Sequence, residues 1–274
     1  MLNKLKVFCF TVFIVVISVI QSHASIFLQD TTADGDADLV PFTQSLAQTG
    51  SGVPGDFEVL MCATTSNGAN SFLDPTPGPF STLDQGSCGG GGDCILGIFT
   101  RFDDSPDETD NFCNWTVATR VFGAGSFRYS GVDTDDPVIG FDCDTGSGII
   151  ATAPSIFTEA GSVVIRIFSS GALNPVMLDN QANQELQGSF TAVSVAGGQE
   201  FVLIHGESFT FQEEGPTGTD ELNIEITADW RACTIALRME PTNIPTLSEW
   251  GLGIFAALFG IAAVWVLRRR AVRA

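Results

Sequence analysis

The sequence predicts an all-β fold, an antiparallel β-sandwich or jelly roll, followed by a single C-terminal transmembrane helix. Three observations lead to this class. Short apolar stretches recur between turns rich in Gly, Pro and Asp, several stretches alternate apolar and polar residues, and helical periodicity does not outlast a turn or two within residues 25–241. This part, called the body below, is long enough for one large sandwich or two small ones.

Residues 1–24 have the features of a secretory signal peptide. Lys4 and Lys6 supply the charged start, residues 7–20 the apolar centre, and Ser22-His23-Ala24 a small-x-small cleavage site. We therefore expect the secretion translocon to export the chain and signal peptidase to cut it, so that the mature protein begins near Ser25.

Strands are predicted wherever the body is apolar or alternating. Residues 222–229 and 232–239 alternate, as half-buried strands do, whereas 163–168 and 201–204 are near-continuous apolar runs that suit a sandwich core. Further candidate strands are 57–61, 95–99, 115–122, 127–129 and 190–195. Residues 64–92 and 103–110 are rich in Pro, Gly or Asp and are predicted to be loops.

Six cysteines remain once Cys9 leaves with the signal peptide, and an exported protein meets an oxidising compartment. We therefore expect disulfides among Cys62, Cys88, Cys94, Cys113, Cys143 and Cys233. Fifteen pairings are possible. Cys88 and Cys94 flank a glycine-rich loop that could close locally. A zinc site is disfavoured because the body has no CxxC pair and a single histidine, His205.

The body is strongly acidic, with six arginines, no lysine and 31 acidic residues, which gives a net charge of −25. Such a surface repels nucleic acid and attracts divalent cations. Asp34, Asp36 and Asp38, together with Asp30, surround Gly35, where a turn could bring carboxylates onto calcium. Two other clusters could do the same: residues 133–136 and 103–110. The alternative for each cluster is a solvated, turn-forming surface, so no cofactor is certain.

Catalytic patterns are weak, and we do not expect an enzyme. His205 lies within an apparent strand, and the chain has no GxSxG elbow, HExxH, P-loop or dinucleotide fingerprint. A carboxylate-pair glycosidase is neither supported nor excluded by so many acids. Trp115, Trp230 and Tyr129 are the candidate sugar-stacking rings.

The C-terminal tail, residues 242–274, combines a short motif, an apolar run and a basic end. The motif is Ile244-Pro245-Thr246-Leu247-Ser248-Glu249-Trp250-Gly251. Residues 252–267 carry no charge, and as a helix they span about 24 Å, close to what a thin bilayer requires. Arg268, Arg269 and Arg270 would hold the far end in the cytoplasm.

This tail resembles the IPTLxxWG type of C-terminal sorting signal, which in Gram-negative bacteria is handled by an exosortase-family membrane transpeptidase. The resemblance rests on Ile244, Pro245, Thr246, Leu247, Trp250 and Gly251. It implies a transient precursor in the inner membrane, cleavage within the motif, and delivery to the cell surface or extracellular matrix. A plain membrane anchor that is never cut is the alternative.

Within the body, residues 196–206 and 222–226 are similar to the closing hairpins of bacterial pre-peptidase C-terminal and related secreted β-sandwich modules. This similarity assigns no ligand. We expect a structural or adhesive body, with a surface polysaccharide as one possible partner. The alternative is a surface-attached hydrolase or carbohydrate-binding module with its site in the acidic loops.

Overall fold

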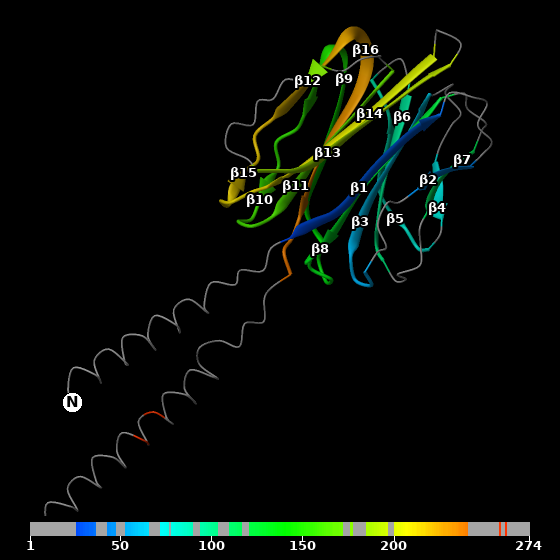
Figure 1. Ribbon diagram of the computed structural model, residues 1–274. Helices are drawn as coiled ribbons and strands as arrows, with labels where there is room; N and C mark the ends of the chain where they lie inside the picture. Colours follow the sequence, from blue (N-terminus) through cyan, green and yellow to red (C-terminus); the bar gives the residue numbers. More distant parts are fainter. Residues whose placement is uncertain are drawn as a thin grey trace, which may run out of the picture. The chain divides into compact units, whose positions relative to one another are not determined.

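The computed structural model describes residues 26–36, 43–47, 53–65, 72–76, 78–89, 94–103, 110–116, 121–171, 176–177, 185–196, 200–240, 258 and 261. Ala24–Glu240 forms one compact unit by its internal contacts. Every regular element described within this unit is a strand, and all paired strands run antiparallel (Figure 1). The predicted all-β antiparallel class is confirmed.

The first sheet has five strands in the order β1 (Phe27–Asp36), β8 (Phe122–Ser130), β3 (Phe57–Thr65), β6 (Cys94–Phe102) and β5 (Ser81–Ser87). Its three central strands, β8, β3 and β6, are buried at every position but the last. A strand alternates its side chains between two faces. Burial of successive residues therefore means that both faces of this sheet are covered.

The second sheet is built around β16 (Asp220–Leu237), which pairs with β9 (Val138–Ala153) on one side and with β11 (Val163–Ser170) on the other. Beyond β11 lie β14 (Glu200–Thr210) and β13 (Glu185–Ala196), and the short β12 (Val176–Met177) also pairs with β16. This sheet packs on the first across the principal core. The principal core includes Val59, Leu96, Ile98, Phe127, Val163, Ile165, Val202, Ile204 and Ile235.

A third layer covers the other face of the first sheet. It consists of β2 (Thr43–Ala47), β7 (Asp110–Trp115) and β4 (Phe72–Thr76). A second core lies between the layers, where Phe72 and Trp115 meet Leu60, Phe99 and Phe122. A separate two-stranded pair, β10 (Phe157–Thr158) with β15 (Gly215–Pro216), completes the described elements of the body.

Most strands predicted from apolar runs are present. Residues 57–61 lie in β3, 95–99 in β6, 127–129 in β8, 163–168 in β11, 190–195 in β13 and 201–204 in β14. The two alternating segments 222–229 and 232–239 were expected to be separate, but residues 220–237 form one strand, β16. The ladder with β9 is irregular between Asn223 and Ala228 and then resumes, so the strand continues.

Two other expectations were wrong. The predicted loop 64–92 contains β4 and β5, which are stabilised by pairing with β7 and β6 rather than by local sequence. Pro75 is tolerated because it falls at an irregularity in β4, an edge strand of its sheet. The predicted strand 115–122 is not one element, since Trp115 ends β7 and Phe122 begins β8 in a different sheet. Of the predicted loop 103–110, residues 104–109 lie outside the described part of the chain.

Three disulfides use all six cysteines of the body. Cys62–Cys113 ties β3 to β7 and hence the third layer to the first sheet, and Cys143–Cys233 joins β9 to β16. Cys88–Cys94 closes the turn between β5 and β6, which is the local pairing that the sequence allowed. The sequence predicted the cysteines involved, whereas the other two pairings required the fold.

The start of the first strand and the segment after the last strand both contact one turn, residues 130–133. Phe27, at the start of β1, pairs with Ser130. Beyond the end of β16, Met239 bridges to Val132, and the backbone N–H of Glu240 donates to the carbonyl of Gly131. The chain therefore enters and leaves the body near the same turn.

Candidate functional site

The sorting motif, Arg268, Arg269, Arg270 and the signal peptide lie outside the described residues. Within the tail, only Leu258 and Ile261 are described, and both have helical backbone. Among the residues that the structure describes, no helix has the length and apolarity needed to cross a membrane.

The turn expected at Gly35 is wrong. Asp34, Gly35 and Asp36 are consecutive members of β1, paired with Ala124, Gly123 and Phe122 of β8. Alternate residues of a strand lie about 6.6 Å apart, so the backbone here is extended and forms no calcium-binding loop. Asp38 lies outside the described residues. Calcium binding by this segment stays a prediction that now needs a different geometry.

The second acidic cluster forms a local turn and an ion pair. The Asp133 carboxylate accepts the backbone N–H groups of Asp135 and Asp136 at 2.8 and 3.3 Å. Asp136 in turn pairs with Arg238, which also binds Glu159 at 3.2 Å. Two of these three aspartates therefore already have protein partners.

One group of described residues brings three metal-ligating side chains together: Asp84, Cys143 and Cys233. The two cysteines form a disulfide, so they offer no thiolate. The Asp84 carboxylate is bound by Arg231 at 2.6 Å. We interpret this group as structural: the Asp84–Arg231 salt bridge joins β5 to β16 of the second sheet, and it lies beside a disulfide.

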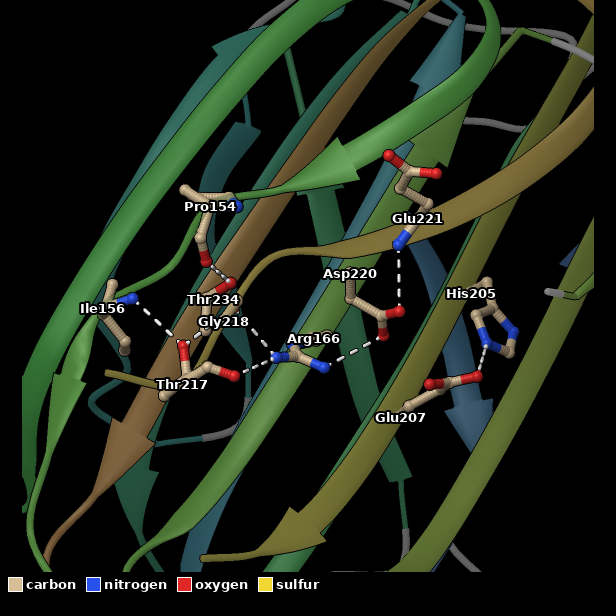
Figure 2. A network of polar contacts seen from close by, with 10 residues as sticks. All are labelled: Pro154, Ile156, Arg166, His205, Glu207, Thr217, Gly218, Asp220, Glu221 and Thr234. Atoms are coloured by element: carbon tan, nitrogen blue, oxygen red, sulfur yellow. Dashed lines mark hydrogen bonds and ion pairs between the residues drawn. The ribbon is translucent and has the colours of Figure 1, made fainter. Parts of the chain in front are cut away.

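A buried polar network lies on the face of the second sheet that is turned away from the principal core (Figure 2). Arg166 of β11 is completely buried and donates to Asp220 at 3.1 Å and to the carbonyls of Thr217 and Gly218 at 2.9 and 3.1 Å. Burial lowers the pKa of Arg166, and the Asp220 carboxylate opposes this. The guanidinium therefore fastens the segment that precedes β16 onto the sheet.

His205 belongs to the same face. Its Nδ1 lies 2.7 Å from Oγ1 of Thr191, its cross-strand partner on β13, and its Nε2 lies 3.0 Å from Oε1 of Glu207. The imidazole is 1% exposed, so it is a buried strand histidine. Both ring nitrogens are satisfied, which a buried histidine requires without any catalytic role. Strand alternation places His205 and Glu207 on the same face, so the sequence could have predicted this contact. The contact with Thr191 could not be predicted, because it depends on how β13 pairs with β14.

A second buried charge cluster lies between the first sheet and the third layer. Glu58 of β3 is flanked in the sheet by Arg101 of β6 and Arg128 of β8, and Arg101 Nε donates to Glu58 at 2.9 Å. Asn111 of β7 bonds to both Glu58 and Arg101. Burial raises the pKa of Glu58, while Arg101 opposes the rise. Hydrogen bonds are directional, whereas apolar contacts are not. These contacts therefore fix the orientation of the third layer on the first sheet.

The candidate sugar-stacking rings are not available at the surface. Trp115 and Tyr129 are completely buried, and Trp230 is 8% exposed. Trp115 packs against Phe122 at 5.1 Å between centroids, within the second core. A carbohydrate could not stack on these rings in the folded body.

The single tyrosine of the chain gives a direct test of core burial. Tyr129 donates to Ser208 at 2.7 Å, and burial raises the pKa of Tyr129 far above its ordinary value. Because the unfolded chain ionises near pH 10, stability should fall as the pH rises above about 10. At about pH 10.5 the native protein should show no phenolate absorbance, whereas the chain in denaturant should be mostly ionised.

The matched control is Tyr129→Phe, which should remove the tyrosine's share of this alkaline destabilisation. A phenolate that titrates near pH 10 in the native protein would show that the ring is not buried as described.

Comparison with known proteins supports the tail. Residues 242–270 match the family model of the IPTL-CTERM motif. A search of curated proteins gave no match, and neither did a search of solved structures. The match covers the tail and not the body. The chain thus carries a C-terminal sorting signal, which marks an exported, cell-surface protein.

Proposed function

We propose that this protein is a structural or adhesive component of the cell surface or extracellular matrix, processed at its tail by an exosortase-family transpeptidase. The IPTL-CTERM match at residues 242–270 carries the proposal. In this account signal peptidase removes residues 1–24, and residues 252–267 hold the precursor in the inner membrane with Arg268, Arg269 and Arg270 in the cytoplasm. The transpeptidase then cuts within residues 244–251.

The body supports a structural role. Three disulfides cross-link its strands, one of them (Cys62–Cys113) between two layers. Each sheet of the sandwich also carries a buried ionic cluster on the face turned away from the principal core. Disulfides form and persist in oxidising surroundings such as the outside of the cell, which suits a body placed there. Its net charge of −25 favours divalent cations, which could bridge acidic chains in a matrix. A rise in melting temperature with calcium, without turnover, would favour this role over the hydrolase or glycan-binding alternative.

Replacing Pro245 and Trp250 together by alanine should leave the precursor in the inner membrane, because the motif no longer fits the enzyme. The matched control is Ser248→Ala with Glu249→Ala, at the two positions that the IPTLxxWG pattern leaves open. Intact mass of the surface-exposed protein is the measurement. The native protein should lack residues 1–24 and the apolar run, and unchanged delivery of the Pro245 and Trp250 variant would refute sorting.

A further inference from the structure

The segment that leads out of the body is firmly held. The N–H of Arg238 donates to the carbonyl of Pro137, that of Asp133 to the carbonyl of Arg238, and that of Glu240 to the carbonyl of Gly131. The Arg238 side chain adds ion pairs to Asp136 and Glu159. The position of Glu240 on the body is therefore fixed.

Three exposed apolar side chains are connected to this segment through neighbouring residues and their contacts. Phe157 is 61% exposed and lies two residues before Glu159, the partner of Arg238. Phe27 is 59% exposed and pairs with Ser130, the neighbour of Gly131. Leu186 is 53% exposed and precedes Gln187, whose amide donates to the carbonyl of Ile26 at 3.1 Å. We call Phe27, Phe157, Leu186 and the segment 237–240 the exit face.

The sorting motif begins very close to the exit face in the chain. Only Pro241, Thr242 and Asn243 separate Glu240 from Ile244. Four fully extended residue steps span about 14 Å, so an enzyme that encloses Ile244 must come within that distance of Glu240. A folded enzyme that grips eight residues is wider than this gap, and it therefore meets the exit face.

The charge around the exit face indicates the kind of partner. Asp135, Asp136 and Glu240 are exposed there, and Glu159 lies beside Arg238. Such acidity opposes docking on an anionic lipid surface. It suits a protein that offers apolar side chains for Phe157 and Leu186 and basic groups around them.

We propose that the exit face is a docking surface for the processing transpeptidase, which binds it together with the motif. This inference rests on the proposed function, because it assumes that the tail is processed. It adds that cleavage depends on the folded body as well as on residues 244–251.

The test is the rate at which the full-length precursor is converted to product in its own host. Phe157→Ser with Leu186→Ser should slow conversion about tenfold, because interface contacts are often concentrated in a few buried apolar residues. Phe27 is left unchanged because it lies close to the signal peptidase site. Leu73→Ser with Ile149→Ser is the matched control, since both residues are exposed (52% and 48%) but lie on β4 and far along β9.

The outcomes separate the two proposals. Equal rates for the exit-face and control variants, while the Pro245 and Trp250 variant stays uncut, would overturn the docking surface alone. Normal cleavage of the Pro245 and Trp250 variant would instead refute the proposed function. Intact disulfides and an unchanged melting temperature exclude misfolding as the cause of a slow rate.

A photo-crosslinking residue at position 157 of the full-length precursor distinguishes enzyme from membrane. We expect an adduct with the transpeptidase that disappears when Pro245 and Trp250 are replaced. An adduct with lipid alone would overturn the docking surface.

Discussion

Replacing Cys143 and Cys233 together by alanine should lower the free energy of unfolding by about 4 to 5 kcal/mol. This bond joins residues 90 apart in sequence, so it removes much conformational freedom from the unfolded chain. The Cys62–Cys113 bond, with a separation of 51, should be worth about 4 kcal/mol, and the Cys88–Cys94 bond, with a separation of 6, about 2 kcal/mol. Denaturant titration of the three non-reduced double variants measures the series.

The order of the three losses is the informative result. If loop closure dominates, the Cys88–Cys94 variant is the mildest, although both of its cysteines are completely buried. Equal losses in the three variants would show that packing around the sulfurs, rather than entropy of the unfolded chain, sets the stabilisation.

Arg166→Met should lower the free energy of unfolding by about 3 to 5 kcal/mol. Methionine fills much of the space, but Asp220, 4% exposed, loses its cation, and the carbonyls of Thr217 and Gly218 lose their donor. Adding Asp220→Asn removes the uncompensated charge and should recover part of this loss. Denaturant titration of the single and double variants gives the coupling between the two residues.

The matched control for this buried pair is Arg238→Met. Arg238 also binds two acids, Asp136 and Glu159, but these ion pairs are exposed to solvent and screened by it. We expect the unfolding midpoint of this variant to stay close to that of the native protein. A loss as large as that of Arg166→Met would mean that burial does not govern the strength of these pairs.

The sequence predicted those parts of the fold that depend on local apolar pattern. Strands β3, β6 and β11 are mainly apolar runs, and the class follows from them. Strands β4 and β5 were missed because their residues are polar or turn-forming and become strands only by pairing with neighbours. The aspartates of β1 were read as a turn for the same reason, since pairing with β8 is invisible in that segment.

The buried charges show a similar limit. Glu58 and Arg166 each interrupt an apolar run, and such an interruption is a readable sign of a buried charge that needs a partner. The partners could not be predicted, because Asp220 lies 54 residues from Arg166 and Arg101 lies 43 residues from Glu58. The sorting motif needed no tertiary information, since the match rests on a continuous run of residues.

The way the chain leaves the body determines how the body bears mechanical load. Tension that enters at Glu240 pulls on β16, which is hydrogen-bonded to β11 on one side and to β9 on the other. A pull along the strand shears both ladders at once, rather than opening one rung after another. Four residues in from Leu237, the Cys143–Cys233 bond passes the force covalently to β9. A tether attached at this end therefore pulls against a covalent bond that lies only four residues from the end of β16.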